Sequence, residues 1–135
     1  MSEAAQKEEA PPAQTGMSFA DAFNLAVRFF NEKRLSEAAE VAQAILRIHP
    51  ANPDTLHLAG VIAHARGDAA LAVELIGKAL GGRRTAAFMN NFANALLACG
   101  RHDEAAAALA AAAALEPETA AAVHHARGLL LMDLD

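Results

Sequence analysis

The 135-residue sequence contains no tryptophan, no tyrosine and only one cysteine, so its aromatic residues are six phenylalanines. With Cys99 alone, the chain can form neither an intrachain disulfide nor a cysteine-based zinc site, which is typical of a reducing compartment. Strands prefer aromatic residues, which make up only 4%, whereas much of the 54% apolar fraction is alanine, the strongest helix former. The composition predicts an all-α, cytoplasmic protein.

A positive charge excess and a long apolar run are also missing. Eleven Lys and Arg stand against 16 Asp and Glu, so the net charge of -5 argues against nucleic acid as a partner. The longest apolar run, residues 105–115, is shorter than the ~20 residues that span a bilayer, and we expect no membrane span. Residues 1–17 have glutamates and a Pro-Pro pair without an apolar segment, which predicts a disordered tail rather than a secretory signal.

Three segments of the remaining chain repeat one another. The small residues Ala38, Ala72 and Ala105 are 34 and 33 residues apart, and the turn residues at 33, 67 and 100 repeat these steps. The repeats cover residues 19–52, 53–85 and 86–119, and a closing helix covers 120–134. Residues 18–135 therefore form one predicted domain of three and a half repeats.

Each repeat has the helix start and stop signals of a helical hairpin. We predict seven helices, near residues 18–32, 36–48, 53–66, 69–80, 86–98, 103–115 and 119–133. Asn52-Pro53 is a helix start, and Ser18, Ser36, Asp68 and Thr85 are predicted N-caps. Gly67 and Gly100 suit the left-handed position that ends a helix.

These residues resemble the tetratricopeptide repeat family. The second copy matches best, with Leu56, Ala59-Gly60, Gly67, Ala72 and Ile76, whereas the first copy has Ala26 in place of glycine. The third copy, with Asn90-Asn91, looks like repeats found beside bacterial glycosyltransferase and sulfotransferase domains, but no such catalytic domain is present in this chain. The resemblance implies a right-handed α-solenoid of antiparallel helix pairs, whose first helices line a concave groove that grips peptides.

Phasing the repeats on the family places an almost uncharged set of residues in this groove. They are Phe23, Asn24, Val27 and Phe30 from the first copy, His57, Leu58, Val61 and His64 from the second, Asn90, Asn91, Asn94 and Leu97 from the third, and His124, His125 and Leu131 from the closing helix. Asparagine amides can pair with a peptide main chain, although they could equally cap helices or face water. We expect a protein-binding adaptor or scaffold.

Catalysis and metal binding have weaker support. His57 and His64 are seven residues apart and His124 and His125 are adjacent, unlike the i, i+4 pair of a helical zinc site, so groove-lining or solvated histidines are favoured. A second hypothesis for them is pH-sensitive binding. Without a nucleophile elbow or phosphate loop, we predict neither an enzyme nor a cofactor. Cys99 stands among apolar residues at a helix end, which predicts a buried thiol.

The predicted closing helix suggests an alternative function. Leu130, Leu131 and Leu134 would leave an apolar edge on the last element, where a finished solenoid is polar. Self-assembly through this edge is the alternative to peptide capture. A further repeat lost from a longer protein would also explain it.

Overall fold

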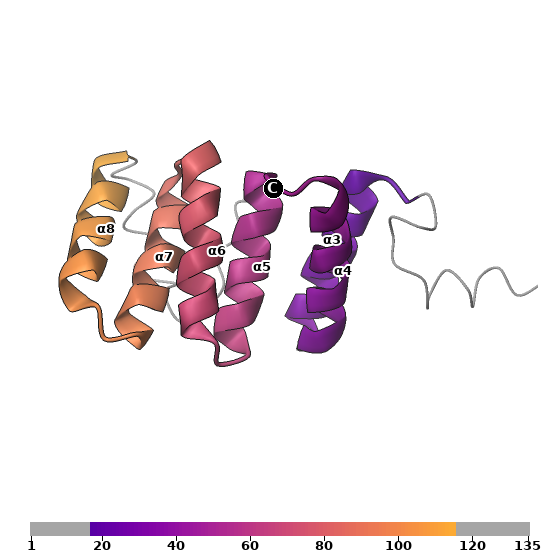
Figure 1. Cartoon of the computed structure of the whole chain (residues 1–135), viewed down its shortest axis with the longest axis horizontal. Coiled ribbons are helices and arrows are strands. Elements are labelled where there is room, and N and C mark those ends of the chain that lie inside the picture. The colour runs from indigo at the N-terminus through magenta and orange to yellow at the C-terminus, as the bar shows by residue number, and fades with distance from the viewer. Residues whose placement is uncertain (1–16, 116–135) are drawn as a thin grey trace, which may run out of the picture.

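The computed structural model describes residues 17–115, which contain six α-helices and no strand. The helices are α3 (Phe19–Asn31), α4 (Leu35–Ile48), α5 (Pro53–Ala65), α6 (Ala69–Gly82), α7 (Ala86–Ala98) and α8 (His102–Leu115). They stand side by side in an elongated row, from α3 and α4 at one end to α8 at the other (Figure 1). The all-α prediction is confirmed, and the six observed helices coincide with the first six predicted ones. The predicted tail and the seventh helix lie outside the described residues.

The first helix of every hairpin begins at a side-chain cap. The side-chain oxygens of Ser18, Asn52 and Thr85 accept hydrogen bonds from main-chain N–H groups three residues later, at 3.1, 2.8 and 3.0 Å. Pro53 follows Asn52 at the first helical position, where its missing N–H costs nothing. These caps set where α3, α5 and α7 start, as the sequence predicts.

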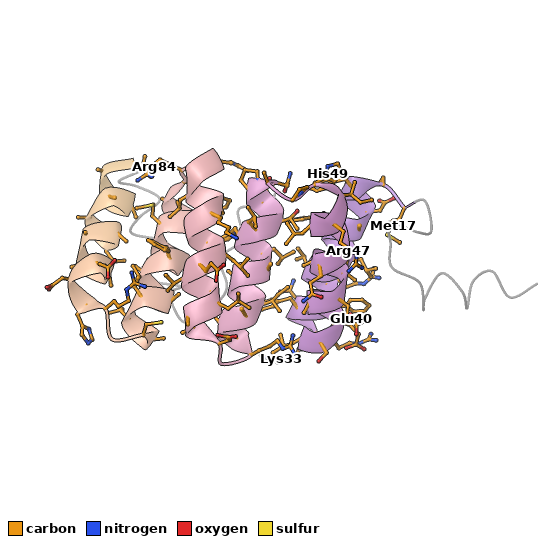
Figure 2. The ribbon with its side chains drawn as sticks, viewed as in Figure 1. Met17, Lys33, Glu40, Arg47, His49 and Arg84 are labelled. Atoms are coloured by element: carbon orange, nitrogen blue, oxygen red, sulfur yellow. The ribbon has the colours of Figure 1, made fainter. Side chains whose placement is uncertain are left out.

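The turn between the two helices of each hairpin needs a left-handed residue. Gly67 and Gly100 have φ of +89° and +78°, and Lys33 holds the same position with φ of +66°. The loop after α4 lies at the other end of this hairpin, since Lys33 and His49 are at opposite ends of the helices (Figure 2). Turns of three residues force the two helices of a hairpin to run antiparallel.

The second helix of the first hairpin does not start at the predicted N-cap Ser36. Helix α4 begins at Leu35 after Arg34, which has no side-chain cap bond. Instead, the Arg34 guanidinium donates to Glu37, and an equivalent Arg101–Glu104 pair stands at the start of α8. Ser36 is exposed inside the first turn, so this predicted cap is wrong. Only in the middle hairpin does Asp68 accept the Leu71 N–H, at 3.1 Å.

Small residues let the two helices of a hairpin approach closely. Ala38, Ala72 and Ala105 have no exposed surface, in agreement with their predicted place at the helix seam. A Cβ at Gly60 would lie 2.5 Å from Cγ1 of Ile76, so α5 and α6 pack closer there than a side chain permits. At these seam positions alanine and glycine leave room for the bulky side chains of the facing helix, such as Ile76.

Two apolar clusters hold the helices together. Each helix packs against the next, and α5 also contacts both α3 and α7, so the first helices lie beside one another. One cluster joins α3 and α4 to Leu58 and Ile62 of α5, and the other runs from Leu56 to Ala112. Phe30 packs against both clusters. None of the helices between residues 17 and 115 combines the length and apolarity that crossing a membrane requires.

Candidate functional site

The predicted groove residues fall into three classes of exposure. Phe23, His57, Leu58, Val61, Asn90 and Asn91 are buried, Val27, Phe30, His64, Asn94 and Leu97 are half-buried, and Asn24 is exposed. We call the second and third classes together the first-helix face. The side chains of the buried class pack between helices, so in this structure they contribute to the stability of the fold. That any of these residues contacts a partner stays a prediction.

His57 sits in a buried polar contact between the second and third hairpins. Its Nε2 accepts a hydrogen bond from the side-chain amide of Asn91 at 2.9 Å, which leaves the ring neutral with its proton on Nδ1. The ring also stacks on Phe88, with centroids 4.2 Å apart and planes 17° apart. Both partners come from α7, so His57 ties α5 to the next hairpin.

Burial, and to a smaller extent the positive charge of Arg83, lowers the pKa of His57 to about 3. Arg83 stands in the loop before α7, where it pairs with Asp54 and lies 5.7 Å from the centroid of Phe88. A histidine with this pKa stays neutral through the physiological range. In the folded protein, the charge of His57 therefore does not change near neutral pH.

Other predicted site residues lie outside the described part of the chain. These are His124 and His125 of the groove and Leu130, Leu131 and Leu134 of the apolar edge. Self-assembly through that edge remains a prediction. Within residues 17–115, no three His, Cys, Asp or Glu side chains gather where they could hold a metal ion.

The prediction for Cys99 is wrong, because its side chain is exposed. Cys99 is the C-cap of α7, one residue beyond the last helical position. The equivalent residues of the earlier hairpins, Glu32 and Arg66, are exposed C-caps as well. The apolar neighbours in sequence therefore do not extend the core to this position.

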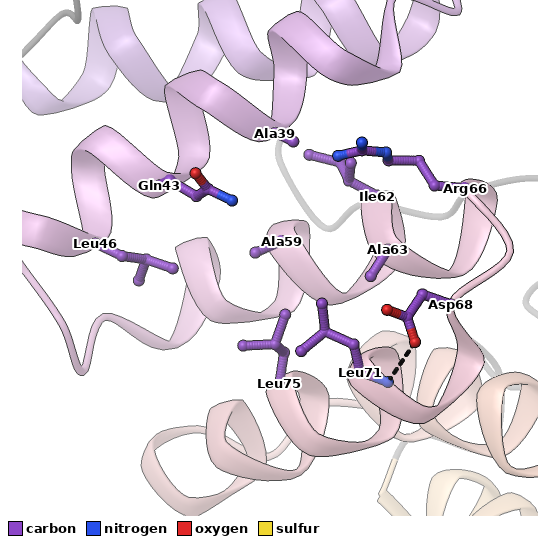
Figure 3. Close-up of a pocket in the computed structure, with 10 residues that line it drawn as sticks. All are labelled: Ala39, Gln43, Leu46, Ala59, Ile62, Ala63, Arg66, Asp68, Leu71 and Leu75. Atoms are coloured by element: carbon purple, nitrogen blue, oxygen red, sulfur yellow. Dashed lines mark hydrogen bonds between the residues drawn. The ribbon is translucent and has the colours of Figure 1, made fainter.

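A cleft of about 460 Å³ opens between the first and second hairpins. It is lined by Ala39, Gln43 and Leu46 of α4, by Ala59, Ile62, Ala63 and Arg66 at α5, and by Asp68, Leu71 and Leu75 at α6. The side chains of Gln43, Leu46, Leu71 and Leu75 point from α4 and α6 toward Ala59 (Figure 3). None of these residues belongs to the first-helix face, so the cleft is a separate surface.

The sequence interpretation missed both the cleft and the His57–Asn91 contact. Aligning the second and third repeats could have indicated the cleft. The second repeat has Ala59 and Leu71 where the third has Phe92 and Glu104. No comparable signal exists for the buried contact, because His57 and Asn91 are one helical position out of register. No family model matches the chain, and a search among curated proteins finds no match either.

Proposed function

We propose that the chain is an adaptor or scaffold module of the tetratricopeptide type, in which hairpins form a right-handed solenoid and hold an extended protein segment. The segment would lie along the first-helix face of α3, α5 and α7. The side-by-side contacts of α5 with α3 and with α7 support this geometry. The proposal is a binding function and involves no catalysis.

The observation that carries the proposal is a row of matching exposure. Phe30, His64 and Leu97 stand at equivalent positions of the three first helices, and all three are half-buried. A half-buried apolar or imidazole side chain offers contact area to a partner while it remains anchored in the fold. Three such side chains on consecutive helices provide a line of contacts across the hairpins.

The polar and charge pattern of the first-helix face suits a peptide main chain. None of its residues is a carboxylate, lysine or arginine, so a bound segment would desolvate no formal charge on this face. Asn24 is exposed and carries both donors and an acceptor, which matches the alternating N–H and C=O groups of an extended chain. Selectivity would come from the apolar side chains beside it.

An affinity capture experiment tests this function. The double variant His64→Glu, Leu97→Glu puts two charges on the first-helix face, and we expect it to recover at least tenfold less of the proteins captured by the wild type. Asn91 is a poorer choice, because its substitution would also break the contact with His57. Recovered proteins are quantified by mass spectrometry, after circular dichroism has verified equal helicity.

The matched control is Ile48→Glu, Leu115→Glu. These two leucine-sized residues are 56% and 42% exposed and lie outside both the first-helix face and the cleft. The control adds the same charge and should capture the same proteins as the wild type. Identical recovery by all three forms of the protein would contradict the proposed function.

A further inference from the structure

The cleft between the first two hairpins exists because one aromatic ring is replaced there. At the next junction, between α6 and α7, Phe92 covers Gly77, and its Cε1 lies 3.7 Å from where a Cβ on that glycine would be. At the first junction the equivalent residues are Ala59 and Gln43, both of which line the cleft. The chain thus shows which chemical group fills such a space, namely a phenyl ring.

A second departure from the repeat occurs at the same cleft. Glu37 and Glu104 occupy equivalent positions in the first and third hairpins, and each is ion-paired with an arginine. The middle hairpin has Leu71 at this position, where its side chain is 40% exposed and lines the cleft. The N-cap of α6 uses only the main-chain N–H of Leu71, which donates to Asp68. The leucine side chain is therefore not needed for capping.

The size and charge of the cleft limit its occupant. A volume of about 460 Å³ is that of a pocket for one or a few side chains and not of an extended interface between folded proteins. Its apolar wall is formed by Leu46, Leu71 and Leu75. At the rim, Asp68 accepts the Leu71 N–H, whereas Arg66 forms no ion pair within residues 17–115. The Arg66 guanidinium is therefore the charged group at the rim that has donors available for an acidic partner.

We propose that this cleft is a second binding site, which takes a phenylalanine side chain of a short partner peptide with an adjacent acidic residue. The ring would lie over Ala59, in the place that Phe92 takes at the next junction. The acidic side chain would pair with Arg66. The site lies apart from the first-helix face, so it could be occupied together with that face.

Titration with a synthetic peptide tests the site on the full chain. The probe is a seven-residue capped peptide with phenylalanine at its centre, glutamate on both sides and glycine or alanine elsewhere. Methyl NMR spectra should show saturable shifts confined to Leu46, Leu71, Leu75 and their neighbours. Replacing the peptide's phenylalanine by alanine should weaken binding at least tenfold, and replacing its glutamates by glutamine should weaken it about threefold or more.

Two protein variants locate the bound ring. Ala59→Phe should fill the cleft from within, and Leu71→Gln should remove its outer wall without adding charge; each should weaken binding at least tenfold. Ile48→Gln is the matched control for Leu71→Gln, since it makes the same change at an exposed residue outside the cleft. If Ala59→Phe fails to fold, Leu71→Gln still decides the matter.

Several results would overturn the proposal. One is equal binding of the phenylalanine and alanine peptides, and another is unchanged affinity in Leu71→Gln. A light-scattering mass that falls from dimer to monomer in Leu71→Gln would assign the cleft to a second copy. Shifts of signals from residues 1–16 or 116–135 in peptide-free Leu71→Gln would assign it to the chain's own ends.

Discussion

The two junctions between consecutive hairpins are built from equivalent helices, yet different side chains fill them. On the side of the second helices, Phe92 over Gly77 closes the second junction, whereas Ala59 and Gln43 leave the first one open. Between the first helices, the second junction contains the polar His57–Asn91 contact. The equivalent residues of the first junction are Phe23 and Leu58, which are both buried in one apolar cluster.

This difference shows that the repeat determines where helices lie, but single side chains determine what each junction can do. A hairpin needs only small residues at its seam and a left-handed turn, and all three hairpins have both. The residues between hairpins vary, because each junction has to fill only its own space. One junction therefore keeps an open cleft, and the other holds a neutral histidine.

Exchanging the aromatic residue between the junctions should have the largest effect. Phe92→Ala should lower the free energy of unfolding by roughly 2–3 kcal/mol, less than for a fully buried ring because Phe92 is half-buried. Ala59→Phe should leave it unchanged or raise it by about 1 kcal/mol, since the ring enters existing space. Urea denaturation measures both. A loss below about 1 kcal/mol for Phe92→Ala would mean that its ring does not seal the second junction.

The buried histidine should make the second junction pH-dependent. His57 has a pKa of about 3 when folded and an ordinary value of 6.5, so between these values the unfolded state binds the extra proton. Its stabilising contribution is complete above about pH 6.5 and falls as the pH is lowered. Between pH 7 and pH 5 we expect a loss of roughly 2 kcal/mol in the free energy of unfolding.

The double variant His57→Phe, Asn91→Leu gives the second junction the apolar pair of the first and should remove this loss. The lowered pKa values of Glu37 and Glu104, caused by hydrogen bonds from Arg34 and Arg101, act only below the ordinary 4.5. They therefore leave the window from pH 5 to 7 undisturbed. Parallel pH profiles of the wild type and the double variant would refute the role assigned to His57.

The smallest effect concerns the turns, which distinguish the first hairpin from the other two. Gly67→Ala should lower the free energy of unfolding by about 1 kcal/mol, because a left-handed φ strains any residue with a Cβ. Lys33 already carries this strain, so Lys33→Gly should raise the free energy by up to about 1 kcal/mol. Thermal and urea unfolding measure both changes. If both substitutions changed the free energy of unfolding in the same direction, the turns would not differ in strain as proposed.

Local chemistry made the helices and their ends predictable from the sequence. Ser18, Asn52, Asp68 and Thr85 cap helices as expected, since an N-cap depends only on residues three positions apart. The error at Ser36 has a local cause as well, because the Arg34–Glu37 pair starts α4 earlier without a capping side chain. The repeat period likewise anticipated the buried seam at Ala38, Ala72 and Ala105.

The candidate site was less predictable, because exposure depends on what packs above a residue. Phasing treats His57 and His64 alike, yet His57 is buried beneath Phe88 and Asn91 while His64 is half-buried. Cys99 shows the converse, since its apolar neighbours leave it exposed at a helix end. Such differences arise between helices that are distant in the chain.

Periodicity, caps and turn residues thus specify an all-helical chain of hairpins, because each of these signals acts within a few residues of the main chain. The pKa of a histidine and the presence of a cleft depend instead on the volumes of side chains brought together from three helices. Ala59 and Phe92 are both ordinary helix residues when each is read alone. Once α4, α5, α6 and α7 are packed, the first opens a cleft and the second closes one.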